Sequence, residues 1–207
     1  MWYSIAIALL VSYLLGNLNG SVCMSALKND DVRSHGSGNA GLTNYIRNYG
    51  RASALYVVAI DMGKAVLACE AGRLIMAGHG MAVEGTAIGA FGVLVGHIFP
   101  ALLGFRGGKG ILSGVTVALM LDWRLGLLVF SIFLVAYLLT GYVSLGSVLS
   151  AGSFGFFYAW VHPTNTFPII AGFTLSFLVV WMHRGNIRRL IKGEERKTNL
   201  FGKGTKK

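Results

Sequence analysis

Three polar stretches rich in Gly and Ser interrupt a chain that otherwise consists of long apolar runs. They cover residues 35–44, 104–110 and 140–147, and each lies before, or at the start of, an apolar run of membrane or near-membrane length. Glycines let backbone N–H groups approach a ligand closely, and helix N-termini carry partial positive charge. Together these properties favour anion sites, most often for phosphate. If the three stretches lie on one membrane face, the sequence predicts a composite phosphate site there.

The composition indicates an all-α integral membrane protein. Hydrophobic residues make up 54% of the 207 residues, and charged residues make up only 13%, against roughly 25% in soluble domains. The net charge of +10 is spread over short loops, which favours an excess of basic residues on cytoplasmic loops over nucleic-acid binding. Attraction of anionic lipid or substrate is the second explanation. Cys23 and Cys69 have no metal-binding spacing, so we expect no metal and no other cofactor.

Seven apolar segments are candidates for membrane-spanning helices, because a helix needs about 20 apolar residues to cross the bilayer. They cover residues 2–27, 52–69, 86–103, 111–121, 125–140, 142–161 and 167–182. The fourth is short and lies three residues from the fifth, so a five-span arrangement with a re-entrant pair is the alternative. We expect one membrane domain over residues 1–201 and a flexible basic tail over residues 202–207.

Basic residues predict the orientation of this bundle of about seven transmembrane helices. With seven spans, the 28–51 loop, the 104–110 loop and the C-terminal tail share one side and hold nearly all of the 18 Lys and Arg residues. Only Arg73 and Arg124 fall on the other side, and Lys64 lies within a helix. Basic loops face the cytoplasm, so the N-terminus is predicted outside and the C-terminus inside. The three polar stretches then meet at the cytoplasmic face.

The polar stretches contain several side chains suited to binding phosphate. Lys109 lies between glycines at the start of the fourth predicted helix, and Arg47 lies one turn beyond Thr43. Each cation is equally well explained as a basic anchor at the membrane surface. The first stretch adds short side chains that can bind oxygen atoms: Ser37, Asn39, Thr43 and Asn44. Thr43 or Asn44 as a simple helix N-cap is the alternative for that pair.

Histidines and buried charges give further candidates. His97 and His183 end predicted helices on the same face as the glycine stretches, where a capping or interfacial role is the alternative. Asp61 and Lys64 lie three residues apart near the middle of the membrane, where we favour an ion pair that holds the bundle. The chain has no GxSxG, HExxH or HxxxxD pattern. Catalysis should therefore depend on substrate placement and charge stabilisation.

Four motifs in order resemble those of the bacterial membrane acyl-phosphate:glycerol-3-phosphate acyltransferases, the PlsY family. They read DVR with GSGNAGLTN, GHIFP with FRGGKG, YVSLGS, and HRGNIRRL with GEERK, and the resemblance reaches from about residue 12 to Lys197. Leu42, Asn17 with Asn19, and Ala65 depart from the family pattern and concern packing. The resemblance implies seven spans with the N-terminus outside, and a place in the bacterial plasma (inner) membrane with the active site facing the cytoplasm.

The resemblance also implies a reaction. A fatty acyl group passes from acyl phosphate to the sn-1 hydroxyl of glycerol 3-phosphate, giving lysophosphatidate (1-acylglycerol 3-phosphate) and inorganic phosphate in phospholipid biosynthesis. An acyl phosphate carries its own leaving group, so a protein nucleophile is dispensable. A substrate phosphate oxygen is our first hypothesis for the base that takes the hydroxyl proton, and His183 is the second.

Residue roles follow from the resemblance. We expect Ser37, Lys109 and His183 to be catalytic. The acyl-phosphate end should meet Ser37, Asn39, Lys109 and the backbone of Gly107 and Gly108. Glycerol 3-phosphate should meet Arg47, Thr43, His183 and Asn186, and Ser144 suits either substrate. The residues expected to shape the site are Gly41, Asn44, His97 and Glu195.

The expected partners are acyl phosphate, glycerol 3-phosphate and membrane lipid, without nucleic acid. A monomer is compatible with the sequence, which does not determine the oligomeric state. The acyl chain should lie in an apolar groove between helices that opens to lipid. One rival class is a membrane transporter of phosphate or a phosphate ester, which would use similar converging helix ends near the midplane. A non-catalytic scaffold in lipid synthesis is the other.

Overall fold

All regular secondary structure within residues 1–198, the part of the chain that the structure describes, is helical. In this computed structural model, ten α-helices and two short 3₁₀ helices follow one another in that range, with no strand. The predicted tail over residues 202–207, and the last residues of the predicted domain, lie outside the described residues. The expected all-α fold class is confirmed.

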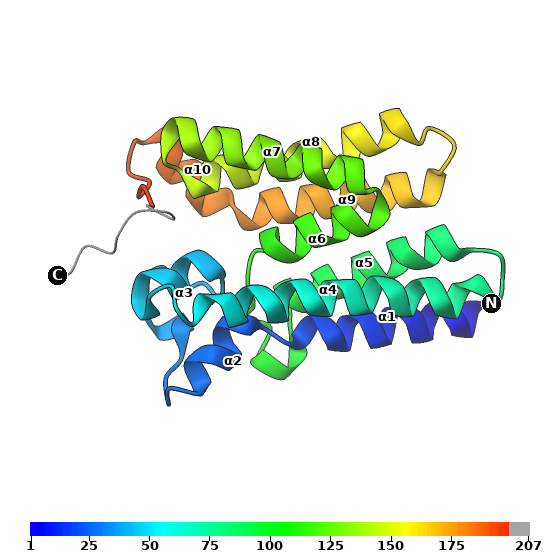
Figure 1. The fold of residues 1–207 in the computed structure, drawn as a ribbon, viewed down its shortest axis with the longest axis horizontal. Helices are drawn as coiled ribbons and strands as arrows, with labels where there is room; N and C mark the ends of the chain where they lie inside the picture. Colours follow the sequence, from blue (N-terminus) through cyan, green and yellow to red (C-terminus); the bar gives the residue numbers. More distant parts are fainter. Residues whose placement is uncertain (199–207) are drawn as a thin grey trace.

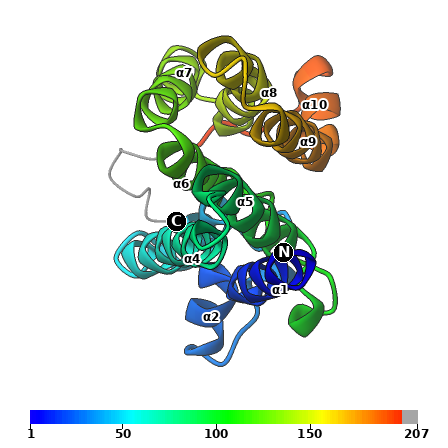
Figure 2. The ribbon, with the colours of Figure 1, turned by 90° about the vertical axis from the view of Figure 1, so that its right-hand side faces the viewer.

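The long helices form two groups, which Figure 1 shows one above the other. The lower group contains α1 (Trp2–Asn17), α4 (Ala54–Ala77) and α5 (Ala82–Ile98). The upper group contains α7 (Trp123–Thr140), α8 (Val143–Val161) and α9 (Thr166–Met182). Viewed along the bundle in Figure 2, α6 (Ile111–Leu121) lies where the two groups meet, and it packs on both α4 and α7.

Three short helices gather at the end of the bundle opposite the N-terminus. They are α2 (Gly20–Ala26), α3 (Leu42–Tyr49) and α10 (Arg184–Ile191) (Figure 1). The 3₁₀ helix Val32–Ser34 lies between the first two, and the other 3₁₀ helix, Ala101–Leu103, follows α5. This end of the bundle therefore collects the loops that contain the three polar stretches.

The bundle is apolar outside and contains small and polar residues inside. The exposed fractions of Leu139 and Trp160 are 81% and 80%, whereas Ser12 and Asn17 are buried. Small residues let helices approach closely: a Cβ on Gly96 of α5 would lie 2.2 Å from the carbonyl oxygen of Tyr13 on α1. This distribution is typical of helices that pack within lipid. The hydrophobic effect does not drive such helices together, so close van der Waals packing through small residues does.

Length and composition alone identify two segments that can cross a membrane, Ala82–Leu103 and Trp123–Thr140. The number rises to four among the described residues if each of two bent helix pairs is a single span. The predicted bounds of the helix over residues 111–121 are confirmed by α6, and those of the following helices differ by one or two residues. The predicted second helix was too short, because α4 continues to Ala77 past Glu70 and Arg73.

The prediction of one continuous helix over residues 2–27 is wrong. The chain is extended at Leu18, and α1 and α2 meet at an angle of 43°. Asn19 begins α2 as its N-cap, because its side chain accepts a hydrogen bond from the backbone N–H of Val22 (3.1 Å). The break is therefore a defined turn inside the bundle.

The first polar stretch does not lead directly into the second long helix, which corrects another expectation. It leads into the short helix α3, whose apolar residues recur at helical spacing: Leu42, Tyr45, Ile46 and Tyr49. These side chains pack on a cluster that includes Val32, Ala40 and Val57. Helix α3 thus closes this end of the lower group and presents its polar face to the end of the bundle.

Candidate active site

A cavity of about 590 Å³ opens at the end of the bundle that holds the polar stretches. Its walls come from the loop before α3, from α3 itself, and from α10 with the segment that follows it. The lining residues are Gly36, Ser37, Asn44, Arg47, Asn48, Arg189, Glu195 and Arg196. Three guanidinium groups and one carboxylate therefore border one space, which suits an anionic ligand.

A chain of hydrogen bonds joins the second polar stretch to this cavity. The Lys109 ammonium donates to Oδ1 of Asn186, and Nδ2 of Asn186 donates to Oε1 of Glu195 (2.6 Å). The other carboxylate oxygen of Glu195 accepts from Nε of Arg189 (2.7 Å). Burial raises the pKa of Glu195, but hydrogen bonds from Asn186 and Arg189 outweigh burial and keep that pKa below its ordinary value. Glu195 is thus an ionised anchor between the cations.

Lys109 lies in an environment that weakens its charge. Burial, reinforced by the nearby charges of Arg189 and Arg47, lowers the pKa of Lys109 to about 8. Its single short hydrogen bond is to a neutral amide. An incoming phosphate would supply the counter-charge that this ammonium lacks.

Asn44 organises the loop that carries Ser37. Its Oδ1 accepts from the backbone N–H of Ser37 (3.0 Å), and its Nδ2 donates to the carbonyl oxygens of Val32 (3.0 Å), His35 (3.0 Å) and Asn39 (3.1 Å). The N-cap hypothesis for Thr43 or Asn44 is wrong, because Gly41 is the N-cap of α3 and no side chain caps it. Asn44 instead holds the loop from within the helix.

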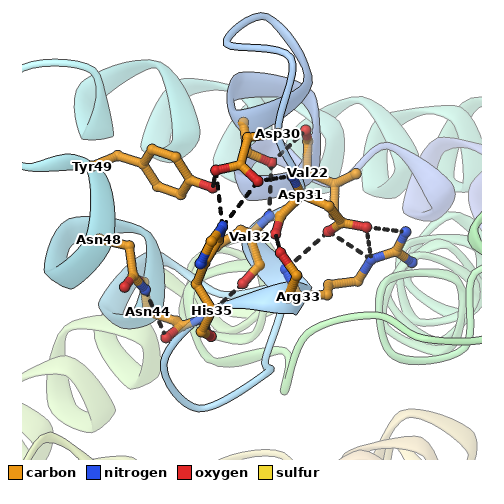
Figure 3. A network of polar contacts seen from close by, with 11 residues as sticks. Val22, Asp30, Asp31, Val32, Arg33, His35, Asn44, Asn48 and Tyr49 are labelled. Carbon is orange, nitrogen blue, oxygen red and sulfur yellow. Dashed lines mark hydrogen bonds and ion pairs between the residues drawn. The ribbon is translucent and has the colours of Figure 1, made fainter.

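A carboxylate ties the ends of the same loop together, as Figure 3 shows. Asp30 accepts a hydrogen bond from the hydroxyl of Tyr49 (2.8 Å), and Nε2 of His35 lies 2.9 Å from the same carboxylate. These bonds, that of His35 first, lower the pKa of Asp30, whereas burial and Asp30 raise the pKa of Tyr49 to about 12. The start of the loop is therefore fixed to the last turn of α3.

Arg33 connects the first polar stretch to the second. Its guanidinium pairs with Asp31 (2.9 Å), and its Nη1 donates to the carbonyl oxygens of Leu103 (2.9 Å) and Arg106 (3.3 Å). This arginine belongs to the DVR motif, for which the sequence alone predicted no role. Its contacts show that it joins the two stretches.

Gly107 and Gly108 run against the last turn of α5 so closely that no side chain fits. A Cβ on Gly107 would lie 2.0 Å from the carbonyl oxygen of His97, and one on Gly108 would lie 2.3 Å from Nε2 of the same histidine. The backbone N–H of Gly108 donates to the His97 carbonyl (3.1 Å). His97 is thus a buried neighbour of the glycine stretch and lies outside the cavity lining.

His183 and Ser144 are buried close to Glu195 and Lys109. Nδ1–H of His183 donates to the carbonyl oxygen of Val179 (2.8 Å), which leaves the lone pair on Nε2, and burial lowers the pKa of His183 to about 4. The Ser144 hydroxyl, in the first turn of α8, lies close enough to Glu195 to help lower the pKa of that carboxylate, but it makes no hydrogen bond of good geometry within residues 1–198. A buried hydroxyl with such a weak contact can turn to a ligand.

The predicted site residues therefore fall into three sets. Four line the cavity: Ser37, Asn44, Arg47 and Glu195. Lys109 and Asn186 join it through a chain of hydrogen bonds to Glu195, and His183 and Ser144 lie close to the same carboxylate. The remaining predicted residues lie outside the lining, and among them Gly107, Gly108 and His97 pack on one another. Asn39 contacts Asn44 through its carbonyl oxygen, and Thr43 lies in the first turn of α3 without a described side-chain contact to the cavity.

Sequence reasoning missed two cations of the cavity, Arg189 and Arg196, which it grouped with the basic tail as membrane anchors. The close spacing of Arg189 and Glu195 was the available signal, because the two form an ion pair (2.7 Å). Arg47 also contacts this segment, because it donates to the Thr198 hydroxyl and to the carbonyl oxygen of Arg196 (3.4 Å). No group of three His, Cys, Asp or Glu side chains within residues 1–198 is placed to hold a metal ion.

Comparisons with known proteins agree on one family. Residues 6–193 match the family model described as glycerol-3-phosphate acyltransferase. The glycerol-3-phosphate acyltransferase of Prochlorococcus marinus strain MIT 9215 is 40% identical over 194 residues, which cover 91% of this chain and 94% of that protein. Glycerol-3-phosphate acyltransferase 1 of Deinococcus radiodurans is 38% identical over 191 residues, with 92% and 94% covered.

Solved structures show the same fold. The crystal structure of PlsY, an integral membrane glycerol 3-phosphate acyltransferase, in its glycerol 3-phosphate form matches with a TM-score of 0.85 and 27% identity, covering 96% of this chain and 100% of that chain. Its lysophosphatidic acid form matches with a TM-score of 0.83 and 26% identity, covering 95% and 96%.

The role of Asn44 in holding the loop is testable. Asn44→Ala removes four hydrogen bonds to the backbone of the loop, so we expect a loss of about 1–3 kcal/mol in the free energy of unfolding and faster amide hydrogen exchange over residues 35–40. Hydrogen-exchange mass spectrometry measures the second effect. Asn48→Ala removes side-chain hydrogen bonds to Asn44 but none to the backbone of residues 35–40, so it is the control and should leave that exchange nearly unchanged. Equal exchange in both variants would contradict the assignment.

Proposed function

The chain belongs to the glycerol-3-phosphate acyltransferase family, and we propose that the acyl donor it uses in phospholipid synthesis is an acyl phosphate. The fatty acyl group passes to the sn-1 hydroxyl of glycerol 3-phosphate, and the products are lysophosphatidate and inorganic phosphate. The two related crystal structures are a glycerol 3-phosphate form and a lysophosphatidic acid form, which supports this acceptor and this product.

The convergence of cations from separate elements on one cavity carries the proposal. Arg47 reaches it from α3, Arg189 from α10, and Lys109 joins it from the glycine stretch through Asn186. Both proposed substrates carry a phosphate, so a common site needs donors for two anions. We assign the acyl-phosphate end to Lys109, Ser37, Asn39 and the Gly107–Gly108 backbone, and glycerol 3-phosphate to Arg47, Thr43, His183 and Asn186. Ser144 suits either substrate.

In the proposed reaction, the sn-1 hydroxyl oxygen attacks the carbonyl carbon of the acyl phosphate. A C–O ester bond forms, the bond between the acyl carbon and the bridging oxygen of the phosphate breaks, and phosphate leaves with that oxygen and the bonding pair. Lys109, Ser37 and the glycine N–H groups stabilise the charge that develops on the leaving group. A substrate phosphate oxygen takes the hydroxyl proton. A pKa of about 4 makes His183 a weak base at neutral pH, so we assign it to substrate binding.

An apolar groove between α5, α6, α8 and α9 is the proposed site of the acyl chain. It begins at Gly110 and Ile111, directly after Lys109. Its walls include Leu94, Gly114, Val117, Val129, Phe154 and Leu175. An acyl chain in this groove would place its carbonyl group beside the glycine stretch, because the polar and apolar sites adjoin at the start of α6.

The proposed setting is the bacterial plasma membrane, with residues 1–201 as one membrane domain and the active site facing the cytoplasm. Seven spans with the N-terminus outside remain our first arrangement, and a re-entrant α6–α7 pair is the alternative. A monomer suffices for this proposal, since all its site residues come from one chain. The cavity at one end of the bundle disfavours a transporter, whose site normally lies near the midplane.

The donor assignment is tested with purified protein in detergent. Glycerol 3-phosphate is supplied with acyl phosphate, acyl-CoA or acyl carrier protein in turn, and lysophosphatidate and free phosphate are measured together. We expect equal amounts of both products with acyl phosphate alone. Lysophosphatidate formed from a thioester without phosphate release would contradict the proposed donor.

The lowered pKa of Lys109 predicts a pH dependence. The ammonium form binds phosphate and is lost as the pH rises through the folded-state pKa of about 8. We therefore expect kcat/KM for acyl phosphate to fall above pH 8, since this ratio reports groups of the free enzyme. Lys109→Arg keeps its charge and should remove the alkaline fall, although its activity is lower. The same alkaline fall in both proteins would show that another group titrates.

His183→Ala separates the two hypotheses for the base. If His183 binds glycerol 3-phosphate, we expect the variant's KM for glycerol 3-phosphate to rise about tenfold, with a smaller fall in kcat. A tenfold rise corresponds to about 1.4 kcal/mol of lost interaction. Steady-state kinetics at saturating acyl phosphate measure both constants. A fall of several orders of magnitude in kcat with an unchanged KM would instead make His183 the general base.

The acyl groove predicts a change in chain-length preference. A Cβ on Gly114 would meet no atom within 4 Å, so this wall of the groove is open at that position, and Gly114→Leu adds bulk there. We expect kcat/KM to fall about tenfold for a 16-carbon acyl phosphate and much less for an 8-carbon one. Gly114→Ala is the matched control with little effect. An equal fall for both chain lengths would place the acyl chain elsewhere.

A further inference from the structure

Three ionisable side chains that the proposed reaction does not use meet inside the bundle. Asp61 and Lys64 belong to α4, and His97 belongs to α5; their exposed fractions are 2%, 3% and 4%. Nζ of Lys64 lies 3.0 Å from Oδ1 of Asp61 and 2.7 Å from Nδ1 of His97. The predicted ion pair is confirmed, and through His97 it adjoins the second polar stretch, although the sequence placed it near the middle of the membrane.

The protons of this cluster can be assigned from its donors and acceptors. A lysine ammonium only donates, so Nδ1 of His97 accepts from Lys64 and the ring proton lies on Nε2. Lys64 also donates to the carbonyl oxygens of Gly16 (3.2 Å) and Leu18, which α1 leaves unpaired where it ends. Three ammonium protons therefore face four acceptors.

The cluster contacts the break between α1 and α2 from both sides. Lys64 donates hydrogen bonds to carbonyl oxygens at the end of α1. Oδ1 of Asp61 accepts a hydrogen bond from the backbone N–H of Gly20, the first residue of α2 (3.1 Å). Asn19 lies within the break, and its Nδ2 donates to the carbonyl oxygen of Ala40 in the first polar stretch (3.0 Å). A connected path thus runs from the ion pair to that stretch.

His97 contacts the second polar stretch with two groups. Its carbonyl oxygen accepts from the backbone N–H of Gly108 (3.1 Å), and its Nε2 faces the Cα of the same glycine, where a Cβ would lie 2.3 Å away. A Cβ there would also lie 2.6 Å from the carbonyl oxygen of Ala40. The two polar stretches therefore touch at Ala40 and Gly108, directly beside the imidazole.

We infer that Asp61, Lys64 and His97 form a positioning unit that fixes the first polar stretch against Gly107 and Gly108. The inference rests on the proposed function, in which both stretches bind the acyl-phosphate end. A buried ion pair gives little net stability compared with apolar residues of similar size, whereas its directional contacts restrict geometry. A displacement of about 1 Å in such donors is enough to lower a rate strongly.

Two variants separate positioning from folding. His97→Leu removes the imidazole but leaves Lys64 three acceptors for its three protons, so the protein should fold. The double variant Asp61→Asn with Lys64→Met removes both charges of the pair together, so neither is left as a buried unpaired ion, while the carbonyl oxygens of Gly16 and Leu18 lose their donor. Glu70→Gln with Arg73→Met is the matched control, because it removes an exposed pair on the same helix with the same three-residue spacing.

We expect both variants to raise the KM for acyl phosphate about tenfold or more and to leave the KM for glycerol 3-phosphate within about threefold. Amide hydrogen exchange should become faster over residues 36–41 and 106–110 together, while the control changes neither property. If the wild type does not use acyl phosphate but the variants still show faster exchange at both stretches, the positioning unit is supported and the donor proposal is refuted. Unchanged exchange at both stretches, or equal changes in both KM values, would overturn the inference.

Discussion

The structure depends on how polar groups are satisfied where α1 breaks inside an apolar bundle. Leu18 is extended, so the end of α1 and the start of α2 expose carbonyl and N–H groups that water does not reach. Lys64 and Asp61 on α4 satisfy them. The broken helix can therefore turn sharply within the bundle, and the turn places Asn19 against the first polar stretch. The buried ion pair of Asp61 and Lys64 and the loop of the first polar stretch are therefore connected through the break at Asn19.

The active site follows from this arrangement. With the loops fixed at one end, cations from α3, α10 and the glycine stretch surround a single cavity, and Glu195 separates and orients them. The groove beside α6 provides an apolar space that begins where the glycine stretch ends. A charged metabolite and a lipid tail can then be held next to each other, which is the requirement of acyl transfer to glycerol 3-phosphate at a membrane.

The sequence predicted the parts of this fold that depend on local signals. The bounds of α6 were predicted correctly, and four of the eight residues that line the cavity were predicted as site residues. The break at Leu18 was missed although glycines and asparagines flank it on both sides, because the whole run was interpreted as one membrane-spanning helix. The contact from Lys64, 46 residues away, that satisfies the Leu18 carbonyl has no local signal. Helix α3 was not predicted as a separate element, although its apolar residues recur at helical spacing and a helix N-cap was considered at Thr43 or Asn44.

The central claim is that the polar stretches form one site on one face of the membrane. The most direct test is accessibility labelling of single cysteines at Ser37 and Lys109, in a background with Cys23 and Cys69 replaced by Ala. A membrane-impermeant thiol reagent is applied to sealed vesicles of known orientation, with and without acyl phosphate. The account predicts that both positions react only from the cytoplasmic side and that the ligand protects both. Reaction of the two positions from opposite sides would contradict it.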